Sequence, residues 1–497
     1  MKRSLLPYSI VLMLLFLLAP GCSMTDKGHD QTQTTNGENP YEDDYSEFAS
    51  LSNRDKWGNA NVHDPSVIKE GDTYYVYSTD AIYKPRGKKF NDDSVHVGNI
   101  QIRSSRDLVN WEFEGWALDS IPPEAVKHVR KHNDGEGATN MWAPYVTKVN
   151  DEFRMYYSVS AFGTNSSYIG LATAPQPLGP WTDKGCVVKT TPESEMNAID
   201  ASVITDEKTG KMWMHYGSFF GGLYCVELDS ETGFTKEQND QGHLLASRAN
   251  LKEENLEAPE VIYNPDQEKY YLFVSYDALF TFYNVRVGRA DSPEGPYYDY
   301  FGKDMRDTTN NYPVLTHSYM FGNHPGWSGN AHCGILNDNG TYYMFHQGRL
   351  APSNEMMLMH IRRIFWLPDG WPVVSPERYA GIDKETVASK EIPGQWEVIQ
   401  LQEIGPMEDL WQGQIPPGGW EYTKKAFNVA DTLVFKKNGT TNSEKSKSWK
   451  LDDGYLYINN SPHALSHAWD WENEESTIIF SGISENGFSI WGKKINK

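Results

Sequence analysis

The stretch EAPEVIYNPDQEKYYLFVSYD, residues 257–277, decides the fold of this chain. A segment with β-branched residues runs into the polar turn NPDQ and is followed by a segment rich in Tyr, Phe and Val. Two apolar segments on either side of a polar turn predict a β-hairpin. Acidic residues are depleted in strands, so the carboxylates at the entry of this hairpin, Glu257 and Glu260, require an explanation.

The same pattern recurs along the chain. Each copy has an entry with a small residue or a proline, then a β-branched pair or near-pair, a polar turn and an aromatic strand. The copies are HDPSVIKEGDTYYVYSTD from His63, WAPYVTKVNDEFRMYYSVS from Trp142, IDASVITDEKTGKMWMHYGSF from Ile199, EAPEVIYNPDQEKYYLFVSYD from Glu257 and AHCGILNDNGTYYMFHQGR from Ala331.

The spacing of the five copies indicates how they assemble. Counted between Val67, Val146, Val203, Val261 and Ile335, the repeats are 79, 57, 58 and 74 residues apart. Each interval has room for roughly four short strands, and few helical patterns intervene. Repeated sheets of this size are typical of β-propeller blades, whereas solenoid repeats are shorter and more regular. We therefore predict an all-β fold in which residues 51–384 form a five-bladed β-propeller.

The remainder of the chain, residues 385–497, is predicted to be a second, smaller domain. GQWEVIQL, TLVFKKNG, GYLYINN and STIIFSGISENGFSIWGKKI read as strands separated by turns, which indicates a small β-barrel or sandwich. This part carries seven tryptophans, which suit either a glycan-binding module or a cap that packs on the propeller, and we favour the cap. They are Trp396, Trp411, Trp420, Trp449, Trp469, Trp471 and Trp491.

The N-terminal segment reads as an export signal rather than as part of the fold. Lys2 and Arg3 precede an apolar run that is too short for a comfortable membrane span. The run ends in LAPGC, which resembles a bacterial lipoprotein signal covering residues 1–21, with Cys22 as the lipidated first residue of the mature chain. Residues 22–50 are polar and acidic, so we expect a disordered tether. The protein is then an exported lipoprotein, anchored to the outer membrane or the cell surface.

Composition limits the range of partners. The 497 residues carry a formal net charge of −22, which disfavours nucleic acid because phosphate binding needs a basic contact face. A neutral substrate is the simpler reading. Aromatic residues make up 13% of the chain and fill sheets or stack on sugar faces. Cys186, Cys225 and Cys333 are too few for a disulfide framework, so we expect buried small residues. We expect a monomer.

The propeller explains the acidic entries. When the repeats are aligned, Asp64, Asp200 and His332 share one position, and His63, Trp142 and Glu257 lie one residue earlier. The first strands of the blades line the central channel, so these side chains converge at one end of it. Crowded carboxylates raise one another's pKa. The alternative is that they are strand-entry caps facing water, but three carboxylates in matching positions favour a shared site.

A site with carboxylates in different protonation states suits the hydrolysis of a glycosidic bond. One carboxylate activates water or attacks the anomeric carbon, and another gives a proton to the leaving oxygen. A third acid near the proton donor orients it and raises its pKa. No nucleophile elbow, phosphate-binding loop, Cys-x-x-Cys knuckle or HExxH motif competes with this interpretation.

The ordered motifs resemble glycoside hydrolase family 43, and within it the two-domain endo-1,5-α-L-arabinanases. The resemblance covers about residues 57–381. It rests on HDPS at 63–66, SSRDLVNW at 104–111, MWAPYV at 141–146, NAIDAS at 197–202, YGSFFGGL at 216–223, EAP at 257–259, NAHC at 330–333 and DGWPVVSPERYAG at 369–381.

The resemblance implies roles for the three acids. Asp64 resembles the general base, Glu257 the general acid, and Asp200 the residue that orients Glu257 and tunes its pKa. Glu260 lies three residues beyond Glu257 in an extended segment, so we expect its side chain to face the opposite way. Family 43 enzymes invert the anomeric configuration, so we expect Asp64 and Glu257 to lie about 6.5–9.5 Å apart, with Asp200 closer to Glu257.

The resemblance also implies contacts to substrate and to a metal ion. Trp142 resembles part of the wall around the cleaved sugar, with blade packing as the alternative. Asn197 and Ser218 resemble partners of sugar hydroxyls, with turn formation and strand filling as the alternatives. His63 would bind substrate or orient the base. His332 resembles the channel histidine that touches a hydrated calcium ion in arabinanases.

The sequence therefore predicts a lipid-anchored enzyme that cleaves α-1,5-linked arabinan, most simply in an endo manner. An exo-acting arabinofuranosidase or a β-xylosidase of the same fold is one alternative. A non-catalytic glycan-binding lipoprotein is another, but binding alone does not need a matched acid and base. A retaining fructan-cleaving enzyme is more distant, since no Arg-Asp-Pro or Glu-Cys motif is present.

Overall fold

The computed structural model describes the chain from residue 57 to residue 496 with several gaps. The described ranges are 57–80, 99–248, 255–277, 279, 282–307, 310–322, 324–351, 357–382, 384, 386–402 and 427–496. The predicted signal segment, Cys22 and the tether lie outside these ranges. Within them, no helix is long and apolar enough to cross a membrane.

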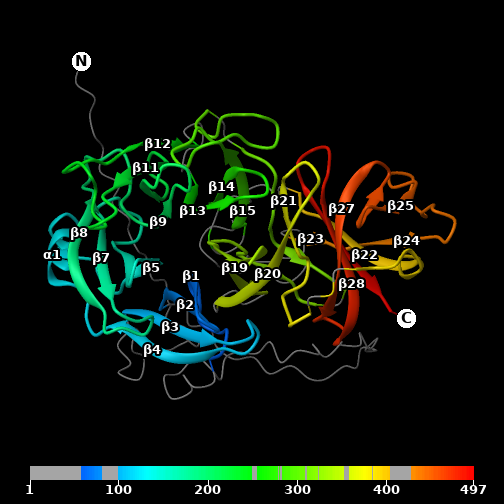
Figure 1. The fold of residues 1–497 in the computed structure, drawn as a ribbon, viewed down its shortest axis with the longest axis horizontal. Helices are drawn as coiled ribbons and strands as arrows, with labels where there is room; N and C mark the ends of the chain where they lie inside the picture. The colour runs from blue at the N-terminus through cyan, green and yellow to red at the C-terminus, as the bar shows by residue number, and fades with distance from the viewer. Residues whose placement is uncertain are drawn as a thin grey trace, which may run out of the picture. The chain divides into compact units, whose positions relative to one another are not determined.

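The described residues from 57 to about 374 form antiparallel sheets set around a common axis (Figure 1). The first sheet is β1 (His63–Glu70), β2 (Thr73–Thr79), β3 (Asn99–Ser105) and β4 (Glu112–Leu118). The second is β5 (Trp142–Val149), β6 (Glu152–Val159), β7 (Tyr168–Ala174) and β8 (Thr182–Lys189). The third is β9 (Ser202–Thr205), β10 (Met212–Tyr216), β11 (Leu223–Leu228) and β12 (His243–Ala246). The next is β13 (Leu256–Asn264), β14 (Lys269–Tyr276) and β15 (Asn284–Ala290).

A further, mixed sheet completes this arrangement. It contains β16 (Tyr319–Met320), β17 (Trp327–Ser328), β18 (Gly334–Asp338), β19 (Thr341–Leu350), β20 (Met357–Trp366), β21 (Pro372–Val374) and β23 (Asn428–Val429). The inner strands contact one another in chain order, from β1 through β5, β9 and β13 to β18, and β18 contacts β1. The structure thus confirms an all-β, propeller-like fold. Helix α1 (Pro123–Lys131) contacts β6 and β7.

The inner hairpins share one backbone device. β1, β5 and β13 each have a bulge near their first residues, where two residues of the inner strand oppose one residue of its partner. Every inner strand entry also has one residue with a positive φ, between 40° and 60°. These residues are Asp64, Ala143, Asp200, Ala258 and His332. Non-glycine residues rarely adopt this conformation, so its recurrence at aligned positions supports the alignment of the repeats.

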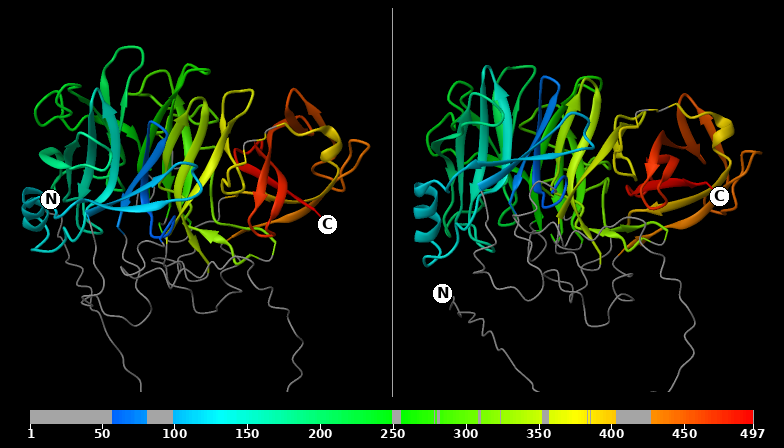
Figure 2. Two further views of the ribbon diagram at one scale, coloured as in Figure 1. Left: turned by 60° about the horizontal axis from the view of Figure 1, so that its bottom comes forward. Right: turned by 90° about the horizontal axis from the view of Figure 1, so that it is seen from below.

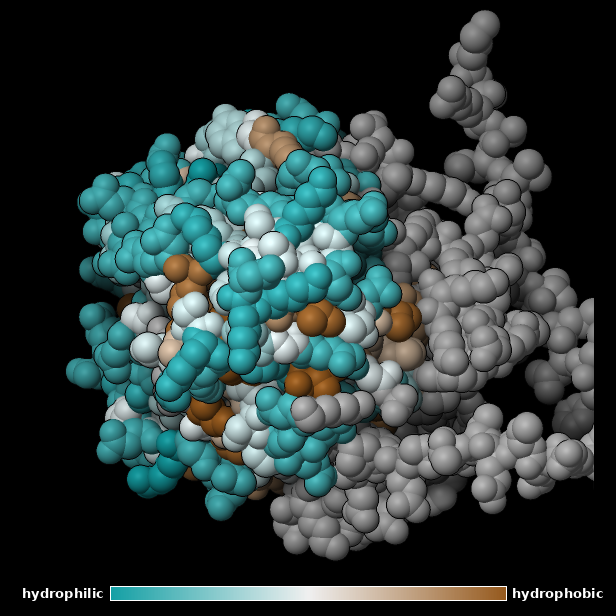
Figure 3. Space-filling model, turned by 90° about the vertical axis from the view of Figure 1, so that its right-hand side faces the viewer, coloured by the Kyte–Doolittle hydropathy of each residue, from teal (hydrophilic) through white to brown (hydrophobic). Residues whose placement is uncertain are grey.

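The C-terminal part is one seven-stranded antiparallel sheet that curls into a half-barrel. Its order is β24 (Asp431–Phe435), β22 (Gly394–Gln400), β29 (Ser489–Ile495), β28 (Glu475–Ile483), β27 (Ser461–Asp470), β26 (Tyr455–Ile458) and β25 (Trp449–Asp452), and the short helix η3 (Ser389–Glu391) precedes it. Its interior is filled by apolar side chains that include Trp396, Phe435 and Phe480. Its visible face is mostly hydrophilic, with small separate hydrophobic spots (Figure 3).

This half-barrel packs against the propeller strands (Figure 2). β23 pairs in parallel with β16, and buried Trp491 of β29 belongs to the same hydrophobic cluster as Trp327 of β17. Trp471 donates a hydrogen bond from Nε1 to the carbonyl of Arg378. The ammonium of Lys493 is buried among three carboxylates, those of Glu377, Asp470 and Glu472.

These contacts agree with the expectation that the C-terminal part caps the propeller. The expectation for the cysteines is also borne out in part. All three are free, and Cys225 and Cys333 are buried, whereas Cys186 is only half-buried.

Candidate active site

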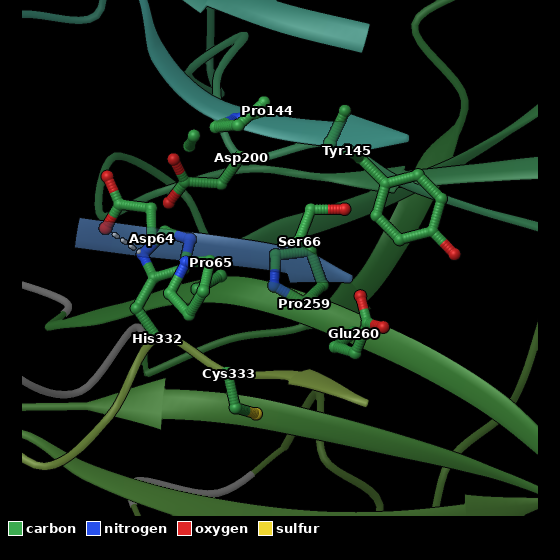
Figure 4. Close-up of a pocket in the computed structure, with 13 residues that line it drawn as sticks. Asp64, Pro65, Ser66, Pro144, Tyr145, Asp200, Pro259, Glu260, His332 and Cys333 are labelled. Carbon is green, nitrogen blue, oxygen red and sulfur yellow. Dashed lines mark ion pairs between the residues drawn. The ribbon is translucent and has the colours of Figure 1, made fainter. Parts of the chain in front are cut away.

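Carboxylates from separate sheets converge on a pocket in the channel of the propeller (Figure 4). Asp64 lies in β1, Asp200 precedes β9, and His332 precedes β18. The pocket encloses about 290 Å³, counting its open mouth. Its thirteen lining residues are Asp64, Pro65, Ser66, Ala143, Pro144, Tyr145, Asp200, Ala201, Ala258, Pro259, Glu260, His332 and Cys333.

Asp64 is buried and held as a carboxylate. Thr79 donates a hydrogen bond from Oγ1 to Oδ2 of Asp64 at 2.7 Å, and Nδ1 of His332 lies 2.8 Å from Oδ1. Nδ1 of His63 lies 3.5 Å from Oδ2. Burial alone would raise the pKa of Asp64, but the neighbouring imidazoles of His332 and His63 outweigh it and hold the pKa well below its usual range. An ionised carboxylate suits a base.

The pKa of Glu257 is shifted in the opposite direction from that of Asp64. Burial raises the pKa of its carboxyl group above the usual range. Two hydroxyl groups oppose this rise: Ser218 donates to Oε2 at 2.7 Å, and Tyr283 donates to Oε1 at 2.6 Å. A raised pKa keeps a carboxyl group protonated closer to neutral pH, as a proton donor requires.

Asp200 is coupled to both of these groups. Burial raises its pKa well above the usual range; His332 opposes the rise, while the negative charges of Glu257 and Asp64 add to it. The backbone N–H of Asp200 donates to Oγ of Ser158 at 3.1 Å, which fixes the strand entry. The pKa of Asp64 is therefore lowered, whereas the pKa values of Glu257 and Asp200 are raised, and such a difference is the condition for dividing the roles of acid and base.

The pKa values of the two histidines beside Asp64 are shifted in opposite directions. Burial would lower the pKa of His332, but the carboxylate of Asp64 raises it to about 9. The backbone N–H of His332 donates to Oγ of Ser275 at 2.9 Å, which anchors its strand entry to β14. Burial lowers the pKa of His63 to about 4, so its ring is neutral at pH 7.

Other predicted site residues have partners within the protein. Trp142 is half-buried at the start of β5 and donates from Nε1 to Asn140 at 2.7 Å. Asn197 is buried, and its Oδ1 accepts a hydrogen bond from Ser167 at 2.6 Å. Ser218 donates a hydrogen bond to Glu257, a contact that the sequence interpretation did not assign to this serine.

The chain matches the family model described as glycosyl hydrolases family 43 over residues 58–372, and a model described as a C-terminal lipocalin-like domain over residues 376–492. This chain belongs to glycosyl hydrolases family 43. As a member of family 43 it is a glycoside hydrolase, and the acids of the channel lie within the matched residues.

Characterised family 43 proteins resemble this chain over most of its length. An extracellular endo-α-(1→5)-L-arabinanase of Thermotoga petrophila is 27% identical over 489 residues, which covers 88% of this chain and 94% of the relative. The crystal structure of endo-1,5-α-L-arabinanase from Thermotoga petrophila RKU-1 superposes with a TM-score of 0.72 at 26% identity, covering 88% of this chain and 99% of that one. An extracellular exo-α-(1→5)-L-arabinofuranosidase of Cellvibrio japonicus is 31% identical, covering 63% of this chain and 86% of the relative.

One expectation about this family 43 site was wrong. Glu260 does not face away from the channel but lines its pocket (Figure 4). The expectation assumed strict alternation along the strand, whereas the bulge between Glu257 and Glu260 adds a residue and removes that alternation. Glu260 is buried, its Oε1 accepts the backbone N–H of Ile335 at 3.2 Å, and burial raises its pKa to about 8.

Three residues of the family 43 site escaped sequence analysis. Thr79 and Tyr283 donate to the carboxylates of Asp64 and Glu257, and buried Arg349 helps to lower the pKa of His63. Thr79 ends the second strand of its hairpin, directly opposite His63, so a search of hairpin partners could have found it. Tyr283 precedes β15, outside the repeat pattern, and nothing in that pattern marks it.

Proposed function

We propose that this protein is an arabinanase that cleaves α-1,5-L-arabinofuranosidic bonds within arabinan by an inverting mechanism. The observation that carries the proposal is that Asp64 and Glu257 are joined through His332 and Tyr283, while the pKa of Asp64 is lowered and that of Glu257 is raised. The substrate and the endo mode of action are taken from relatives that cover most of the chain. The Cellvibrio relative keeps an exo-acting α-L-arabinofuranosidase as the second candidate.

The proposed reaction follows from the opposite pKa shifts of Asp64 and Glu257. Asp64 takes a proton from a water molecule as its oxygen forms a bond to the anomeric carbon. The bond from that carbon to the leaving oxygen breaks, and Glu257 gives its proton to the leaving oxygen. We assign to Asp200 the role of orienting Glu257 and tuning its pKa, while the negative charge of Asp64 helps to raise that pKa. One water molecule enters per bond, and the two carboxyl groups exchange their proton states in each turnover.

We assign the surrounding residues to sugar binding. Trp142, half-buried at a strand entry, forms a wall for the sugar that is cleaved. Asn197 and His63 bind sugar hydroxyls. Ser218 contacts Glu257 and lies within reach of the same sugar, so it serves both the acid and the substrate.

A hydrated calcium ion in the channel is part of the proposal. Asp64, Asp200 and Glu260 line the pocket beside His332 and offer carboxyl oxygen atoms, the ligands that a hard cation prefers. In the described residues, the one group of three acidic, His or Cys side chains close enough to share an ion lies elsewhere and surrounds Lys493. We therefore propose an ion that keeps most of its water, and its charge would favour the ionised form of a neighbouring carboxylate. Metal content measured before and after chelation tests this.

The architecture and the cell location extend the proposal. We infer that β18, β19, β20 and β21 act as a fifth blade within their larger sheet, and that the domains divide at residues 384 and 385. The extracellular relatives support export, and the LAPGC sequence supports lipidation of Cys22 and anchoring in the membrane. Mass spectrometry of the mature N-terminus tests the anchor, and light scattering tests the monomer.

The deciding experiment is digestion of linear arabinan followed in two ways. Thin-layer chromatography should show a ladder of oligosaccharides early in the reaction, whereas an exo enzyme would release one small product. Proton NMR of the first product should show inverted configuration. Retained configuration would remove Asp64 from the role of base, and cleavage of xylan in place of arabinan would overturn the substrate assignment.

A further inference from the structure

The turn between β10 and β11 lies directly against the proton donor. Ser218, at the start of this turn, forms an isolated bridge with Glu257 and donates a hydrogen bond to its carboxylate. The next residue, Phe219, donates its backbone N–H to the carbonyl of Leu256 at 2.8 Å. The turn is therefore tied to β13 at two neighbouring residues, Leu256 and Glu257.

Close backbone packing fixes the conformation of this turn. A Cβ on Gly217 would lie 2.5 Å from the carbonyl oxygen of Gly222, and a Cβ on Gly221 would lie 2.1 Å from that of Glu195. Both glycines also have positive φ angles, at 131° and 81°. No larger residue fits at either position, so the turn holds one conformation.

This fixed turn presents two phenyl rings. Phe219 has a φ of 54°, and it is the only Phe, Tyr or Trp with a positive φ in the described ranges. Bulky residues are strained in this conformation, and such strain clusters at ligand-binding sites. Phe219 is half-buried and Phe220 is 37% exposed, and both follow directly after Ser218, which contacts Glu257.

Because the turn lies beside Glu257, it lies on the side of the substrate that carries the leaving group. The proton donor faces the oxygen that leaves, so whatever sugar is attached to that oxygen departs past the groups that flank Glu257. Asp64, which activates water, comes from a different sheet. Phenyl rings bind the apolar faces of sugar rings and carry no charge, which suits a neutral chain.

We propose that Phe219 and Phe220 form the platform that binds the leaving-group half of the sugar chain and so set the preference for polymeric substrate. This inference rests on the proposed glycosidase reaction and adds a substrate-binding subsite to it. The platform binds furanosyl residues on the side of the cleaved bond that Glu257 protonates.

The test uses the full-length chain with Phe220→Ala, and with Phe220→Trp as the variant that keeps a ring. Phe301→Ala is the matched control, because Phe301 is 47% exposed but packs against Tyr312 in another region. Two substrates are compared. Arabinohexaose with a labelled reducing end fills both halves of the site, and arabinotriosyl fluoride has a leaving group without any sugar.

Phe220→Ala should lose about tenfold in kcat/KM on arabinohexaose, which is the scale of one aromatic contact, and should change which bonds are cut. Its kcat/KM on the fluoride, and both values for Phe301→Ala, should stay within about twofold of wild type. Phe220→Trp should keep the wild-type cleavage pattern.

Two results would overturn the platform while leaving the reaction intact. One is wild-type kinetics and cleavage pattern for Phe220→Ala on the hexaose. The other is an equal loss on both substrates, which would mean that the ring supports the catalytic groups. Failure of the wild-type protein to cleave arabinohexaose at all would overturn the proposed function together with the platform.

Discussion

Replacing Tyr283 by Phe should extend activity to higher pH. The Tyr283 hydroxyl donates to Oε1 of Glu257 at 2.6 Å, and this bond favours the ionised carboxylate. A hydrogen bond to a charged group contributes about 1.5–3 kcal/mol, and one pKa unit corresponds to about 1.4 kcal/mol. Loss of the bond should raise the pKa of Glu257 further, which moves the alkaline limb of the activity profile up by about one to two pH units.

The sign follows from the role of Glu257. A general acid must be protonated, so activity falls as the pH rises through its pKa, and a higher pKa postpones that fall. Ser218 still holds the other carboxylate oxygen, so the maximal rate should fall by less than about tenfold. The measurement is kcat/KM on arabino-oligosaccharides as a function of pH.

Tyr271→Phe is the matched control for this experiment. Tyr271 is a buried tyrosine whose hydroxyl donates to the carbonyl of Gly370 at 2.6 Å, away from the carboxylates. Its profile should coincide with that of wild type. An alkaline limb that stays in place or moves down in Tyr283→Phe would show that Glu257 is not the group that titrates there, and the assignment of the acid would fail.

Three further results are expected. Glu257→Gln should lose most activity in arabinan assays. Glu260→Gln should keep most of it, because the amide oxygen can still accept the backbone N–H of Ile335 that Glu260 binds. A severe loss of activity in Glu260→Gln would mean that the general acid is misassigned. Lys493→Met should destabilise the fold by about 3–5 kcal/mol in urea denaturation because it leaves buried carboxylates without their cation, while Lys450→Met at an exposed pair should change nothing measurable. Burial would raise the pKa of Asp277, but two arginines outweigh it and lower the pKa, so its stabilising effect is lost as the pH falls below about 4, and Asp277→Asn should flatten that part of a stability–pH curve.

The repeats made much of this fold accessible from sequence. A propeller places equivalent residues at equivalent points, so aligning HDPS with IDAS and NAHC was sufficient to bring Asp64, Asp200 and His332 to one pocket. Glu257 followed from the same alignment. The C-terminal half-barrel was also predictable, because its strands alternate and are separated by polar turns.

The alignment could not predict contacts that join different repeats or depend on the loops. Tyr283 precedes the third strand of its sheet, so its contact with Glu257 depends on how the loop before it folds back. The contact from Ser218 crosses from the third sheet to the next one. The orientation of Glu260 was mispredicted for a different reason. A bulge changes which side of the sheet the following side chains face, and the hydrophobic pattern of the sequence does not reveal it.

The bulged strand entries explain how one repeated element supplies two kinds of catalytic group. Asp64, Asp200 and His332 occupy the position with positive φ, while at β5 and β13 that position holds an alanine and the functional side chain, Trp142 or Glu257, lies one residue earlier. One residue along an extended strand is about 3.3 Å, so the same element used in two registers offsets Asp64, the proposed base, from Glu257, the proposed acid, along their strands. A sugar and a water molecule must fit between these groups in an inverting hydrolase. An exchange that moves the acid into the other register, Glu257→Ala with Ala258→Glu, should therefore preserve the fold but abolish turnover, and turnover near the wild-type rate would show that this offset is not what separates the two groups.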